Sequence, residues 1–190
     1  MVEPLEALTR ATAQYAEALA MVEADEWNTR STCPDWTVRD LADHVVGGNR
    51  FAAALLAGRS TQDAYSAAFE GGFGNDPNLE FDVSAAAQLT AFATAGPFDR
   101  LLPHPVGNIS ARVFLGFRVG DLLLHGWDMA RSVGKDADLD DRLAAEVWNS
   151  PQPFREGVTT PGHFGAGPSG ELAADAPLSH RLLDLTGRRP

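Results

Sequence analysis

The strongest constraint on the fold is an apolar stripe with helical spacing along three long segments of the chain. In residues 4–25, 37–57 and 110–133, the stripe recurs every three or four positions, which places its members on one face of a helix. The members are Leu5, Leu8, Thr12, Tyr15, Leu19 and Val22, then Leu41, His44, Val45, Gly48, Phe51 and Leu55, and finally Phe114, Phe117, Asp121, Leu124, His125 and Asp128. Each segment therefore needs other helices against which to bury this face.

Local signals predict the remaining elements. The alanine-rich residues 84–95 predict another main helix, and residues 141–149 predict a shorter one. Thr37, followed three residues later by Asp40, is typical of a capped helix start. Glycines and prolines make residues 59–81 a long crossover, in which QDAYSAAFE predicts a short helix. The segment RLLPHPVGNISA predicts a small hairpin or extended turn.

Together these elements predict an all-α fold, namely a four-helix bundle with one long crossover and an irregular C-terminal tail. We expect residues 1–150 to form the bundle. Residues 151–190 are rich in proline and glycine, and we expect them to wrap over its surface, with a helical turn or two near 179–185.

Composition excludes several classes of protein. The 190-residue chain has 15 basic and 26 acidic residues, for a net charge of −11, and no basic stripe, so we expect no binding to nucleic acid. A single cysteine, Cys33, indicates a reducing compartment. The acidic N-terminus does not resemble a signal peptide, and no long apolar run predicts a membrane span. We therefore expect a cytoplasmic protein.

Three polar residues interrupt the apolar stripes. Asp121 and His125 lie four residues apart on one helix face, and His44 lies in the stripe of another helix. Two imidazoles and one carboxylate suit Zn²⁺ or another borderline divalent cation, and three ligands leave coordination positions open for water or substrate. A metal-free ion pair between Asp121 and a histidine would give the same pattern, and a lone core histidine is more often structural.

Asp128, three residues beyond His125, is the candidate catalytic residue, either as an orienter of that histidine or as a substrate contact. We expect Cys33 to be a buried, inert thiol. Packing roles are expected for Trp36 and Trp127, and surface salt bridges for Arg118 and Arg131.

Three further histidines are weaker candidates for the site. We expect His104 and His163 to be solvated, whereas His180 lies near the C-terminus and could reach the mouth of the bundle. Any of them would close the site if it were a fourth ligand.

Three segments carry a resemblance to a known family: CPDWTVRDLADHVVGGNRFAAALLAG, FRVGDLLLHGWDMARSVG and the ending HRLLDLTGRRP. They resemble the actinobacterial branch of the DinB/YfiT-like metal-binding proteins, which is related to the N-terminal domain of mycothiol-dependent maleylpyruvate isomerase. The resemblance implies a divalent metal, usually zinc, at one end of a four-helix bundle. Its ligands would be His44, Asp121 and His125.

Two departures from that isomerase shape the functional expectation. Asp121 stands where the isomerase carries a glutamate, and a chain of 190 residues leaves no room for the isomerase's additional C-terminal domain. We therefore expect a metal-dependent thiol transferase or isomerase-like enzyme, in which mycothiol or a bacillithiol-like thiol attacks a small electrophile. Zinc is the first expectation for the metal, with nickel, iron or manganese as alternatives. A metal-dependent hydrolase, a non-catalytic metal- or ligand-binding protein and a homodimer paired through helix faces stay open.

Overall fold

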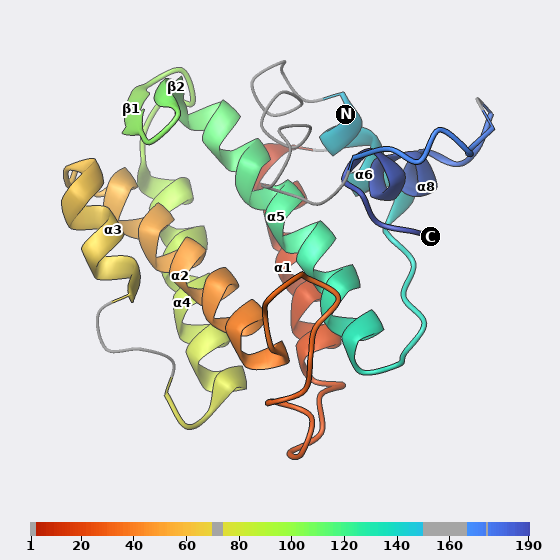
Figure 1. The fold of residues 1–190 in the computed structure, drawn as a ribbon. Coiled ribbons are helices and arrows are strands. Elements are labelled where there is room, and N and C mark those ends of the chain that lie inside the picture. The colour runs from red at the N-terminus through yellow and green to blue at the C-terminus, as the bar shows by residue number, and fades with distance from the viewer. Residues whose placement is uncertain (1–2, 70–73, 150–166, 174) are drawn as a thin grey trace.

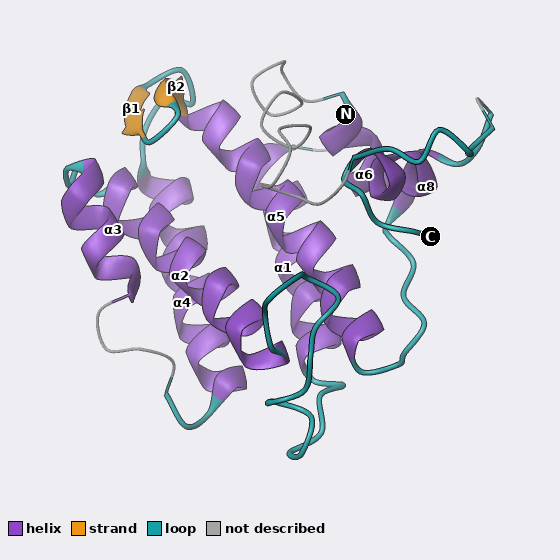
Figure 2. Ribbon diagram, in the orientation of Figure 1, coloured by secondary structure: helices purple, strands orange, loops and turns teal. Residues whose placement is uncertain are grey.

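The protein is mostly helical (Figures 1 and 2) in a computed structural model that describes residues 3–69, 74–149, 167–173 and 175–190. The four long helices are α1 (Pro4–Leu19), α2 (Val38–Leu56), α4 (Pro77–Thr94) and α5 (Ala111–Ser132). Helix α1 packs against α5 and α4, and α2 packs against α4 and α5. The expected all-α class is confirmed. Among the helices described, none is long and apolar enough to cross a membrane.

Five shorter elements complete the described structure: α3 (Thr61–Phe69), β1 (Leu101–His104), β2 (Gly107–Ser110), α6 (Asp141–Trp148) and α8 (Leu178–Leu185). The two strands form an antiparallel hairpin, and α3 packs on α2. Helix α6 lies between α5 and α8 (Figure 1). These elements confirm the predicted hairpin, the short helix in the crossover, the helix after α5 and the helical turns near the C-terminus.

Side-chain caps set the start of the two helices that carry the candidate ligands. At α2 the Thr37 hydroxyl accepts a hydrogen bond from the Asp40 N–H at 3.1 Å, and the Asp40 carboxylate accepts one from the Thr37 N–H at 2.8 Å. At α5 the Ser110 hydroxyl accepts from the Val113 N–H at 3.3 Å. Both caps satisfy backbone donors that have no partner within the helix.

Two helix boundaries differ from the prediction. Helix α1 ends at Leu19 instead of residue 25, because the N–H groups of Met21 and Val22 donate to carbonyls three residues back instead of four. Helix α4 begins at Pro77 instead of residue 84, because Asp76 caps it by accepting from the Leu79 N–H at 3.1 Å. The crossover is therefore shorter than predicted.

The core is one apolar cluster between the long helices, with Tyr15, Phe81, Phe92, Phe114 and a run of leucines at 122–124 among its fully buried members. The C-terminal helix α8 is attached to it through α6, where the Arg181 guanidinium lies 4.5 Å from the centre of the Trp148 ring. Most of the proline- and glycine-rich stretch of the predicted tail falls on residues 150–166, outside the described residues. The division at residue 150 stays a prediction.

Candidate metal centre

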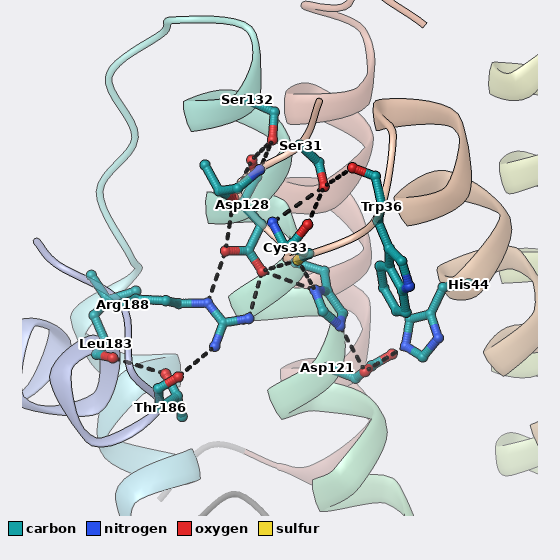
Figure 3. A network of polar contacts seen from close by, with 12 residues as sticks. Ser31, Cys33, Trp36, His44, Asp121, Asp128, Ser132, Leu183, Thr186 and Arg188 are labelled. Atoms are coloured by element: carbon teal, nitrogen blue, oxygen red, sulfur yellow. Dashed lines mark hydrogen bonds and ion pairs between the residues drawn. The ribbon is translucent and has the colours of Figure 1, made fainter. Parts of the chain in front are cut away.

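The three predicted ligands meet where α2 faces α5 (Figure 3). His44 Nε2 lies 3.3 Å from Asp121 Oδ1, and His125 Nε2 lies 3.4 Å from the same oxygen. The two imidazole rings stand edge to face, with their centres 5.0 Å apart. Two nitrogens and one oxygen thus converge on a common point.

The spacing of these atoms fits a divalent cation. Zinc bonds of about 2.0–2.1 Å in a tetrahedral site place neighbouring ligand atoms about 3.3–3.4 Å apart. The separations of 3.3 and 3.4 Å at Asp121 Oδ1 match that spacing. They are longer than the 2.7–2.9 Å or so of a charge-assisted hydrogen bond, which a metal-free ion pair would favour. The donor set and its spacing therefore fit a metal ion with open coordination positions.

The site is accessible mainly on the side of His44. The His44 side chain is 38% exposed, whereas those of Asp121 and His125 are 14% and 6% exposed. The prediction that His44 is buried is wrong, because an apolar stripe identifies the inward face of a helix but not how completely its neighbours cover it. A partly exposed ligand gives a small molecule a route to the site.

The second oxygen of Asp121 is held by a buried arginine. Arg118 donates to Asp121 Oδ2 at 2.7 Å, to Gln88 Oε1 at 2.7 Å and to Asn49 Oδ1 at 2.9 Å. Burial alone would raise the pKa of Asp121, but Arg118 and the two histidines outweigh burial and hold this pKa well below its usual range. Asp121 is therefore ionised, with Oδ1 directed at the histidines.

The prediction that Arg118 forms a salt bridge at the surface is wrong, because its ion pair with Asp121 is buried. Its side chain is buried between α2, α4 and α5, because Gly48 on α2 leaves room for the guanidinium. A sequence signal existed, since Gly48 lies in the inward stripe of α2 and Arg118 lies one turn before Asp121. Arg131, by contrast, pairs with exposed Asp136 as predicted, at 3.0 Å.

The other ring nitrogen of His125 is bound by Asp128. Its Nδ1 lies 2.9 Å from Asp128 Oδ2, and the Asp128 side chain is buried. Burial tends to raise the pKa of Asp128, but the hydrogen bond from His125 and the charge of Arg188 hold this pKa below its usual range. An ionised acceptor at Nδ1 places a ring proton there and directs Nε2 toward the point that it shares with Asp121 Oδ1 and His44 Nε2.

The loop before α2 covers the two histidines (Figure 3). The Trp36 ring centre lies 4.8 Å from that of His44 and 6.1 Å from that of His125, so Trp36 packs on the candidate ligands themselves. Cys33 Sγ donates to Asp128 Oδ2 at 3.4 Å and lies 3.9 Å from His125 Nδ1. Burial, reinforced by the negative charge of Asp128, raises the pKa of Cys33 well above its usual range. The thiol is therefore protonated, as expected for an inert cysteine.

The other histidines within the described residues lie away from this centre. His104 is half-buried, with its ring centre 5.2 Å from that of Phe114 and 5.6 Å from that of Phe117. The expectation that it is solvated is wrong, because the hairpin folds it against α5. His180 is exposed on α8, and His163 lies outside the described residues. Trp127 is buried, as predicted.

Comparison with known proteins identifies the family. Residues 8–130, which include all three candidate ligands, match the model of the mycothiol maleylpyruvate isomerase N-terminal domain. The chain belongs to this family. Two uncharacterized proteins of Mycobacterium tuberculosis, MT0763 of strain CDC 1551 and Rv0738 of strain H37Rv, are each 35% identical to it over 148 residues. The match covers 76% of this chain and 75% of each relative.

Solved structures of the family share the fold. Two crystal structures of the mycothiol-dependent maleylpyruvate isomerase, one of them of a mutant, match 82% of this chain. Their TM-scores are 0.53 and 0.59, the latter for the mutant, at 14% and 17% sequence identity. The chain spans 66% of the length of the solved isomerase chains.

Proposed function

We propose that this protein is a metal-dependent enzyme that uses mycothiol, or a similar low-molecular-weight thiol, to modify a small electrophilic substrate. The observation that carries the proposal is the convergence of His44 Nε2, His125 Nε2 and Asp121 Oδ1 in a chain of the mycothiol maleylpyruvate isomerase family. Zinc is the first candidate, because imidazole and carboxylate are ordinary zinc ligands. Nickel, iron and manganese accept similar donors.

A divalent cation on these ligands would offer open positions at which a thiol loses its proton near neutral pH. The residues of the chain prepare that site. Arg118 holds Asp121 through Oδ2, which leaves Oδ1 for the cation. Asp128 keeps the proton of the His125 ring on Nδ1, and Trp36 shields both imidazoles from one side. Both oxygens of Asp128 already accept hydrogen bonds. We therefore propose that Asp128 orients the His125 ring and does not contact the substrate.

We propose thiol transfer, with isomerisation by reversible thiol addition as the related alternative. The solved isomerase chains are longer than this one, and their substrate is not assumed for it. The partners we propose are therefore a small electrophile and a thiol of the reducing cytoplasm. A hydrolase would use the same open position for water instead of a thiol.

Spectroscopy of the cobalt-substituted protein tests the proposal. Adding mycothiol should introduce sulfur-to-cobalt charge-transfer bands, and the same thiol should accelerate loss of a generic electrophile such as monobromobimane. His44→Ala should remove both effects, whereas His180→Ala, which changes an exposed side chain on α8, should keep them. Turnover of ester or amide substrates with no spectral response to thiol would indicate the hydrolase. If the protein showed neither turnover nor a spectral response to thiol, it would be a non-catalytic binding protein.

A further inference from the structure

We propose that Arg188, the third residue from the C-terminal end of the sequence, is a positioning residue of the candidate metal centre that acts through Asp128 on His125. The inference rests on the proposed function, since it concerns the same site. It adds a part of the chain that lies outside residues 8–130, the segment that matches the family model.

The contact between Arg188 and Asp128 is a buried double hydrogen bond. Arg188 Nε donates to Asp128 Oδ1 at 2.8 Å, and a terminal nitrogen donates to Oδ2 at 2.5 Å. The two side chains are only 9% and 2% exposed. Paired bonds from a planar guanidinium fix the plane of a carboxylate as well as its charge. Arg188 therefore determines how the Asp128 carboxylate is turned.

The orientation of Asp128 in turn determines that of the His125 ring. Oδ2, one of the two oxygens held by Arg188, also accepts the hydrogen bond from His125 Nδ1 at 2.9 Å. If the guanidinium were absent, the carboxylate could turn toward Thr32, whose hydroxyl donates to Oδ1 at 3.2 Å. His125 would then lose the acceptor that directs its Nε2 at Asp121.

The end of α8 directs Arg188 to this position (Figure 3). The N–H of Gly187 donates to the Asp184 carbonyl and that of Arg188 to the Leu183 carbonyl, both at 2.9 Å, which is the Schellman ending of a helix. Gly187 adopts φ +81°, a conformation that suits glycine. The turn sends Arg188 back toward α5, whereas the next residue, Arg189, pairs with Asp184 and stays 54% exposed.

Arg189 provides a matched control for the first test. We expect Arg188→Gln to weaken binding of Zn²⁺ about tenfold, measured by competition with a chromogenic chelator, because loss of a residue that orients a metal ligand typically has an effect of this size. Arg189→Gln removes the same charge from the adjacent residue and should leave the affinity unchanged. Arg188→Lys keeps the charge but loses the paired geometry, so its affinity should fall between those of the wild type and Arg188→Gln.

A double-mutant cycle separates positioning from a general structural role. If Arg188 acts through Asp128, then Arg188→Gln should have no further effect on zinc affinity in the Asp128→Asn background. The same fold-change in both backgrounds would overturn the inference. So would an unchanged affinity in the Arg188→Gln single variant.

Proton NMR of the metal-free protein tests the inference independently of the proposed function. The hydrogen-bonded Nδ1 proton of His125 should be visible in the wild type and in Arg189→Gln, and lost to solvent exchange in Arg188→Gln. Persistence of the signal in Arg188→Gln, or its absence from the wild type, would overturn the role of Arg188. Failure of the wild type to bind Zn²⁺ would instead refute the proposed function, and the NMR result would still decide the role of Arg188.

Discussion

At the scale of single residues, the partners of two aspartates determine the chemistry of the site. Asp121 divides its oxygens between Arg118 and the two imidazoles, whereas both oxygens of Asp128 accept from Arg188 and Oδ2 also binds His125. Each carboxylate is thus neutralised by one buried arginine and turned toward a histidine by it. A buried carboxylate without such a partner would favour its neutral form, which is a poor metal ligand.

Arg118 should matter for stability as well as for metal binding. Arg118→Met would leave Asp121 without its counter-charge and Gln88 and Asn49 without their donor. Removal of one partner from a buried pair costs about 3–5 kcal/mol, and we expect the lower end because Asp121 is slightly exposed. Urea denaturation of the chelator-treated protein measures this loss, with Arg131→Met as the surface control. A change below about 1 kcal/mol would contradict the role assigned to Arg118.

Cys33 should be unreactive in the folded protein. Burial and the Asp128 charge raise its pKa well above the usual range, so the thiol stays protonated near pH 8, and only the thiolate is a good nucleophile. In chelator-treated protein, iodoacetamide should modify it at least about 100-fold more slowly than in the denatured chain. Mass spectrometry of timed samples measures both rates. Equal rates would show that the thiol is neither buried nor bound to Asp128.

At the scale of helices, Gly48 of α2 leaves the space that the buried side chain of Arg118 occupies. A Cβ atom on Gly48 of α2 would lie 2.3 Å from a terminal nitrogen of Arg118, whereas one on Gly126 of α5 would find its nearest neighbour at 3.5 Å, at Tyr15. Both glycines lie inside helices, where alanine is intrinsically favoured. The two positions therefore separate helix propensity from packing.

The two glycine substitutions should differ in their effect on the free energy of unfolding. Gly48→Ala should displace the Arg118 side chain and lower the free energy of unfolding by about 1–3 kcal/mol. Gly126→Ala should leave it unchanged or raise it by up to about 1 kcal/mol. Thermal and urea denaturation of both variants measure the difference. A stabilising Gly48→Ala would mean that Arg118 does not occupy the space beside Gly48.

At the scale of the whole molecule, the hairpin forms a second cluster, in addition to the candidate metal centre. In this cluster the hairpin packs His104 against the rings of Phe51, Phe114 and Phe117. The Val106 N–H donates to His104 Nδ1 at 3.3 Å, which requires an unprotonated nitrogen. Protonation of His104 would break this hydrogen bond and place a charge among the aromatic rings, which would weaken the attachment of the hairpin to the long helices.

Acid should weaken this attachment. Burial lowers the pKa of His104 to about 4, below its value of 6.5 in the unfolded chain, so the unfolded state takes up the proton first. The contribution of neutral His104 to the free energy of unfolding is therefore complete above about pH 6.5. It decreases as the pH falls from there to about pH 4. Urea denaturation across this range should show a smaller decline for His104→Gln than for the wild type. The exposed His180→Gln should follow the wild type, and identical slopes for all three proteins would contradict the assignment.

Local patterns were enough to predict most of the fold and the three candidate ligands. The cap at Thr37 and the apolar stripes lie within single helices, so the sequence alone indicates them. Helix α4 was predicted too short because Leu79, Phe81 and Val83 alternate with polar residues near its start, which is not a helical pattern.

Longer-range contacts were not predictable from one sequence. Cys33 and Arg188 reach Asp128 from 95 and 60 residues away. A single arginine on a helix, such as Arg118, is predicted to lie at the surface unless the residues of the facing helix that bind it are known.

The metal content of the purified protein tests the central claim most directly. Elemental analysis of protein expressed with added zinc should find close to one divalent ion per chain. His44→Ala and His125→Ala should each reduce this to background while circular dichroism shows unchanged helicity, and His180→Ala should keep the ion. Full metal content in the His44 and His125 variants, or no metal in the wild type, would contradict a metal centre on His44, Asp121 and His125.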